Sequence, residues 1–109
     1  MEITFKVQGS ALEPYEVSFF GNGKNLTAHC TCPAGRVGQY CKHRLAILQG
    51  INPGVVSGNE SEINTVRSWV VDTDVGHALE EYAETERSLE DAKAKFAISK
   101  KRLARALMN

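Results

Sequence analysis

Every cysteine of this 109-residue chain lies between Cys30 and Cys41, and His43 follows the last of them by two positions. The four residues have the spacing C-x-C, eight intervening residues, then C-x-H. Structural zinc sites hold the ion with four cysteine or histidine side chains in a tetrahedron. The cluster therefore predicts one zinc site with Cys30, Cys32, Cys41 and His43 as its ligands.

Four protein ligands leave no position for an activated water, so the metal is expected to be structural rather than catalytic. Other interpretations of the thiols fit less well. An odd number of cysteines leaves one without a disulfide partner, and a C-x-C disulfide closes a small, strained ring. A cysteine nucleophile needs a base, and here the histidine is better used as a ligand. No other catalytic set is evident, and the chain is not expected to be an enzyme.

The N-terminal third has the alternation of a small antiparallel sheet. Apolar residues occupy every second position in residues 3–7, 15–19 and 26–32, and the stretch "GNGK" at 21–24 suits a hairpin turn. The last of these strands would present Cys30 and Cys32 on one face. Pro33, Gly35 and Gly38 then indicate a loop.

The stretch "CKHRLAILQG", residues 41–50, predicts a short helix that ends at Gly50. Residues two apart on a helix point in directions about 200° apart. Cys41 is therefore expected to precede this helix, with His43 in its first turn. Such a placement lets both side chains reach the same ion.

The remaining chain is expected to hold a connection and a long helix, which makes the fold α+β. Residues 1–50 form the zinc-binding meander with its short helix, 51–74 a linker with a possible short helix, and 75–109 a long amphipathic helix. Asp72 or Asp74 is the predicted cap of this last helix. From Val75 to Leu107 the helix would be about 48 Å long.

Residues 15–48 resemble a SWIM-type zinc finger, a family defined by C-x-C followed by C-x-H. The segments "YEVSFF", "AHCTC" and "YCKHRLAIL" stand where that family has its hairpin, first ligand pair and short helix. The resemblance implies the same four ligands, Cys30, Cys32, Cys41 and His43, and a role in binding DNA or protein. It covers about a third of the chain and implies nothing about residues 51–109.

The predicted long helix has a seam whose steps alternate between four and three residues, the rhythm of a possible coiled coil. Acidic residues dominate 76–91, and basic residues without any acid occupy 92–109. An antiparallel second copy would pair the opposite charges, so an antiparallel homodimer is predicted. The alternative is that the helix folds back on its own finger. The larger seam residues are Tyr82, Leu89, Phe96 and Leu103.

Two functions remain open. Balanced totals of 13 basic and 13 acidic residues favour a protein-interaction adaptor or regulator over a DNA-binding protein. The finger nonetheless carries basic residues that could contact phosphates. No apolar run reaches the length of a membrane span, and the first residues lack a secretory signal, so a cytoplasmic protein is expected. The candidate nucleic-acid contacts are Lys24, Arg36, Lys42 and Arg44.

Overall fold

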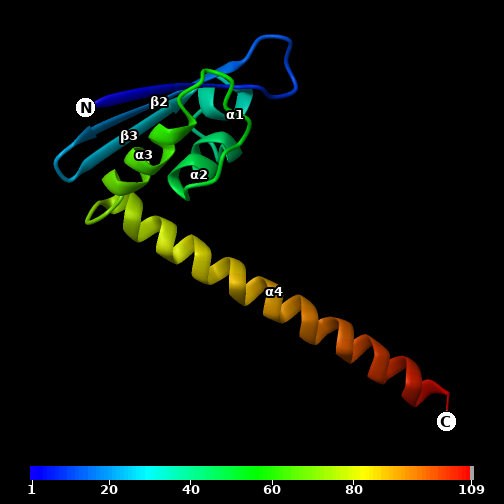
Figure 1. The fold of residues 1–109 in the computed structure, drawn as a ribbon. Coiled ribbons are helices and arrows are strands. Elements are labelled where there is room, and N and C mark those ends of the chain that lie inside the picture. The colour runs from blue at the N-terminus through cyan, green and yellow to red at the C-terminus, as the bar shows by residue number, and fades with distance from the viewer. Residues whose placement is uncertain (109) are drawn as a thin grey trace. The chain divides into compact units, whose positions relative to one another are not determined.

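The computed structural model describes residues 1–108 and shows an antiparallel sheet followed by helices (Figure 1). The expected α+β fold, a small meander followed by a long C-terminal helix, is confirmed. In chain order the elements are β1 (Glu2–Val7), β2 (Tyr15–Asn22), β3 (Asn25–Cys30), α1 (Pro33–Arg36), α2 (Lys42–Leu48), η1 (Glu60–Glu62), α3 (Ile63–Trp69) and α4 (Asp74–Leu107).

The sheet has the order β1-β2-β3 with both pairs antiparallel. The turn between β2 and β3 contains only Gly23 and Lys24, and Gly23 has φ 61. Glycine at the first central position of a two-residue hairpin adopts such a positive φ without steric cost. The glycine-rich stretch therefore forms the tight turn that its composition predicted.

One face of the sheet is buried beneath α2 and α3, which lie on the same side of it in Figure 1. Phe5 and Phe19 are fully buried, and their rings meet edge to face with centroids 5.9 Å apart. Ile47 from α2 and Val66 from α3 complete this core, and both are fully buried. The alternation of side chains along each strand is what gathers the apolar residues on this face.

Residues 54–59 pack against the outer edge of β1. The backbone N–H of Gln8 donates to the carbonyl oxygen of Gly54 at 2.9 Å, and the N–H of Val56 donates to the carbonyl of Lys6 at 2.8 Å. An uncovered strand edge presents unpaired backbone groups and invites association. This segment, which the sequence indicated as a linker, thus satisfies backbone groups at the edge of the sheet.

Helix α4 begins after Thr73, whose side chain is its N-terminal cap. The Thr73 hydroxyl accepts a hydrogen bond from the backbone N–H of Gly76 at 3.0 Å and donates one to the carbonyl of Val70 at 2.6 Å. Only 1% of Thr73 is exposed. The predicted cap, Asp72 or Asp74, was wrong: Asp72 lies outside the helix with φ 60, and Asp74 is the first helical residue.

The chain divides into a compact unit, Met1–Gly76, and a helical unit that begins at His77. None of the α4 residues from Asp74 to Leu107 is buried. Among residues 1–108, no helix is long and apolar enough to cross a membrane. Pairing of α4 in a coiled coil stays a prediction.

Candidate metal centre

The first pair of predicted ligands lies where β3 ends. Cys30 is the last residue of β3, and its pairing with Val17 places it on the buried face. The expectation that the strand continues to Cys32 was wrong. Cys32 has φ −63 and ψ 159 and caps the four-residue helix α1, where a loop was expected. A flat strand would keep the two Cβ atoms about 6.5 to 7 Å apart, so the turn into α1 helps to bring the sulfurs together.

The second pair lies at the start of α2, as predicted. Cys41 is the N-cap residue of α2 and has extended backbone dihedrals, whereas His43 is the second residue of the helix. The helix ends at Leu48 and is closed, as expected, by Gly50, which has φ 82 and donates its N–H to the carbonyl of Ile47 at 2.9 Å. Placing Cys41 before the helix allows its side chain and that of His43 to converge.

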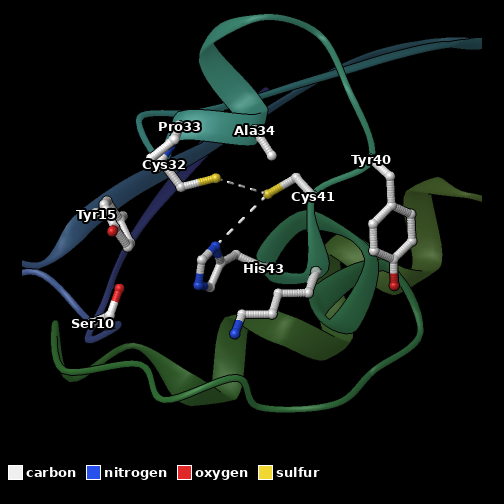
Figure 2. A pocket seen from close by; sticks show the side chains of 9 residues that line it. Ser10, Tyr15, Cys32, Pro33, Ala34, Tyr40, Cys41 and His43 are labelled. Carbon is white, nitrogen blue, oxygen red and sulfur yellow. Dashed lines mark hydrogen bonds between the residues drawn. The ribbon is translucent and has the colours of Figure 1, made fainter.

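The four ligand atoms lie within 4.8 Å of one another. The Cys32 and Cys41 sulfurs are 3.4 Å apart, and Nδ1 of His43 lies 3.8 Å from the Cys41 sulfur and 3.9 Å from the Cys30 sulfur. A zinc tetrahedron with Zn–S near 2.3 Å and Zn–N near 2.0 to 2.1 Å has edges of about 3.5 to 3.8 Å. Figure 2 shows Cys32, Cys41 and His43 pointing toward one another. The donor set fits one zinc ion.

The site is buried, since each of the four ligand residues is at most 6% exposed. Buried cysteines and a buried histidine that face one another are costly unless their polar atoms are satisfied. A tetrahedral ion satisfies all four, and because every position belongs to a side chain, the zinc is structural. It ties the end of β3 to the start of α2.

The surroundings of Cys30 and Cys41 shift the pKa values of their thiols in opposite directions. Burial raises the pKa of the Cys30 thiol from its usual 9.0 to about 12. Burial also opposes ionisation of Cys41, but hydrogen bonds from the backbone N–H of Arg44 and from the Cys32 and His43 side chains outweigh it. They lower the pKa of Cys41 to about 6.

Backbone N–H groups also point at the sulfurs. The N–H of Cys32 donates to the Cys30 sulfur at 3.5 Å, and the N–H of Gly35 donates to the Cys32 sulfur at 3.3 Å. Three thiolates and a neutral histidine around zinc carry a formal charge of −1, which such donors stabilise. The peptide backbone of α1 is thus part of the surroundings of the metal centre.

Sequence reasoning missed Tyr15, the first residue of β2. Its ring lies 5.2 Å from the ring of His43, centroid to centroid, and forms part of an open pocket beside the ligands (Figure 2). The signal was present, because Tyr15 shares the alternation of Val17 and Phe19 and so belongs to the buried face. Tyr15 packs beside the imidazole of His43.

The four candidate nucleic-acid contacts are not gathered in one place. Lys24 lies in the β2–β3 turn, at the end of the hairpin opposite Cys30, whereas exposed Arg36 and Lys42 lie close in sequence to the ligands. Arg44 is half-buried and donates to the carbonyls of Ala28 at 3.1 Å and Gln39 at 2.8 Å. Its guanidinium holds β3 and the loop before α2 together.

The predicted seam residues all fall within α4. Leu89, Phe96 and Leu103 are 53%, 62% and 64% exposed. The Tyr82 hydroxyl donates to the Glu86 carboxylate at 3.4 Å. Helix α4 thus carries large apolar side chains on its surface.

Residues 15–51 match the family model of the SWIM zinc finger. The match spans β2, β3, α1 and α2 and contains all four ligands, so this segment is a SWIM-type zinc finger. No curated protein and no solved structure matched the chain significantly.

Proposed function

Because residues 15–51 form a SWIM-type zinc finger, we propose that the protein is a non-catalytic adaptor or regulator that acts by binding other proteins. In this proposal the zinc is a scaffold and α4 is the recognition element. The observation that carries it is the closed metal centre: four buried side chains occupy the four positions of the ion. A metal surrounded in this way holds a fold together and does not activate water.

The recognition role of α4 is supported by its surface. A helix of 34 residues with large, exposed apolar side chains on one seam is unusual for a soluble protein unless another helix covers the seam. Amphipathic helices bind partners by laying their apolar stripe against a complementary surface. We infer that α4 also dimerises the protein, which would present two fingers in one assembly.

The experiment is a comparative pull-down from cells of the native host with the full-length, zinc-loaded protein as bait, after nuclease treatment. The seam variant Leu89→Ala/Phe96→Ala is compared with Ile98→Ala, which removes an exposed apolar side chain outside the seam. The proposal expects a protein partner that is lost with the seam variant and kept with Ile98→Ala. Equal capture by both variants would contradict a recognition role for α4.

DNA binding is the second candidate function. It is favoured by one observation: residues 17–59 contain no acidic residue, and exposed Arg36 and Lys42 lie between metal ligands in the sequence. Basic side chains bind phosphates by releasing counterions, and this binding weakens steeply as salt rises. Such a surface would add the finger itself as a second binding element.

Fluorescence anisotropy with a labelled DNA duplex tests this candidate. DNA binding predicts an affinity that persists at about 200 mM salt and falls in Arg36→Glu/Lys42→Glu. Lys24→Glu, at the other end of the hairpin, is the matched control and should retain binding. Absence of binding even at about 50 mM salt would exclude the candidate.

A further inference from the structure

The seam of α4 separates large from small side chains by heptad position. With Tyr82 placed at position a, every a residue from Tyr82 to Leu103 is large and every d residue is small. In a parallel pair a faces a and d faces d, whereas in an antiparallel pair a faces d. Only the antiparallel arrangement sets each large residue opposite a small one. The a residues are Tyr82, Leu89, Phe96 and Leu103, and the d residues are Ala78, Thr85, Ala92, Ser99 and Ala106.

A hollow on α4 marks one receiving position. It is lined by Tyr82, Thr85, Glu86 and Leu89. These are the positions i, i+3, i+4 and i+7, the four residues that form the hole for one incoming side chain in coiled-coil packing. Thr85 is the smallest of these four residues, so a large a residue of a second helix fits there.

The charges select the register. The last acidic residue of α4 is Asp91, and a run of basic residues begins at Lys93, with Arg87 the one Lys or Arg before it. An axis between Glu90 and Asp91 places Leu89 opposite Ala92, and Phe96 opposite Thr85, of a second copy. In this register the two-fold axis of the pair lies at the boundary between the acidic and the basic half of α4.

The flanking positions support the same register. In an antiparallel pair, e residues face e residues and g residues face g residues. Here Glu86 faces Lys93 of the second copy, and Glu81 faces Arg102 of the second copy. A shift of one heptad that moves the axis to Ala94 would instead bring Lys93 close to its own counterpart. Like charges in these positions oppose association.

The geometry points to a second copy of this chain as the occupant of the α4 seam, antiparallel, with its two-fold axis beside Glu90 and Asp91 and its Phe96 side chain in the hollow over Thr85. This inference rests on the proposed recognition role of α4 and names the partner, its direction and its register. Two copies bury the exposed faces of Leu89, Phe96 and Leu103.

Charge reversal of the facing pair tests the register. Glu86→Lys alone places lysine against lysine twice in the dimer, and Lys93→Glu alone places glutamate against glutamate twice. Each variant, as the full-length zinc-loaded chain, should dimerise about tenfold more weakly than the wild type. An equimolar mixture restores both attractive contacts and should recover wild-type association. Analytical ultracentrifugation measures all three samples.

Matched controls carry the same charge changes outside the seam: Glu84→Lys at position c and Lys101→Glu at position f. Both should associate like the wild type. Far-ultraviolet circular dichroism confirms that α4 remains helical in every variant. Single variants that dimerise as tightly as the wild type would overturn the register. So would an equimolar mixture that associates no more tightly than its separate components. A monomeric wild type at about 100 μM would overturn the dimer, whereas the adaptor function is decided separately by the seam-dependent pull-down.

Discussion

The indole ring of Trp69 in α3 lies against Gly21 in β2, and a Cβ atom built on Gly21 would come within 3.0 Å of two ring atoms. The single tryptophan of the chain therefore reports on the contact between α3 and the sheet.

Gly21→Val should destabilise the compact unit by about 2 kcal/mol, because the larger side chain must displace the indole ring. Urea denaturation followed by tryptophan fluorescence measures the loss. Ser18→Val, on the opposite face of the same strand, is the matched control and should lose little stability. Equal stability of both variants would contradict the packing of Trp69 over Gly21.

Removal of zinc by a strong chelator at neutral pH should unfold the compact unit Met1–Gly76, because binding of the metal contributes directly to folding in small fingers. Tryptophan emission should shift to longer wavelength as Trp69 leaves its contact, and added zinc should restore it. Elemental analysis should give one zinc per chain. An unchanged spectrum after complete removal would show that the core folds without the ion.

Zinc affinity should rise with pH. Cys41 has a pKa of about 6, below its usual 9.0, so its stabilising contribution is complete above pH 9 and is lost as pH falls through 6. Cys30 has a pKa raised to about 12, so its protonated thiol stabilises the folded, zinc-free state below pH 9. This contribution to stability is lost as pH rises to 12.

At pH 7 zinc must therefore displace the proton of Cys30, so affinity should rise by at least about tenfold per pH unit. Competition with a chromophoric chelator of known affinity measures this slope. A constant affinity between about pH 6.5 and 8 would contradict the assignment.

Arg44→Ala should cost about 1 to 2 kcal/mol, because it removes two charge-assisted hydrogen bonds to the carbonyls of Ala28 and Gln39. Arg36→Ala, at an exposed position of α1, removes the same charge and should cost little. Thermal unfolding of the zinc-loaded variants separates the two. Equal losses of stability in the two variants would mean that Arg44 stabilises the fold only through its charge.

Leu89→Ala/Phe96→Ala should halve the molar mass measured by light scattering, from twice the 12.0 kDa of one chain to that of one chain. The loss of two large seam residues removes most of the apolar area available to a second helix. Ile98→Ala removes an exposed apolar residue outside the seam and should leave the mass unchanged. A monomeric wild type would rule out the dimer before any variant is needed.

The metal centre was predictable because its four ligands lie close together in the sequence, with a spacing that can be recognised without the rest of the chain. Cys41 before a helix and His43 within its first turn follow from helix geometry alone. The end of β3 was not predictable from alternation, which continues to Cys32, because the requirement that the sulfurs meet overrides the strand pattern.

The cap of α4 and the packing of residues 51–74 depend on tertiary structure. Asp72, Thr73 and Asp74 are all good capping residues, and burial of Thr73 beside Val70 decides among them. Turn-forming residues in 51–60 gave no indication that Gly54 and Val56 pair with the edge of β1, since that pairing joins segments distant in sequence.

The sulfur of Cys32 accepts a hydrogen bond from the N–H of Gly35 at 3.3 Å, and the same sulfur is one of the four metal-ligand atoms. The electron density of that one atom is therefore shared between a cation and a peptide proton. Exchanging zinc for cadmium would therefore shift the NMR resonance of the Gly35 amide proton. A scalar coupling between the cadmium nucleus and that proton would report directly on metal binding.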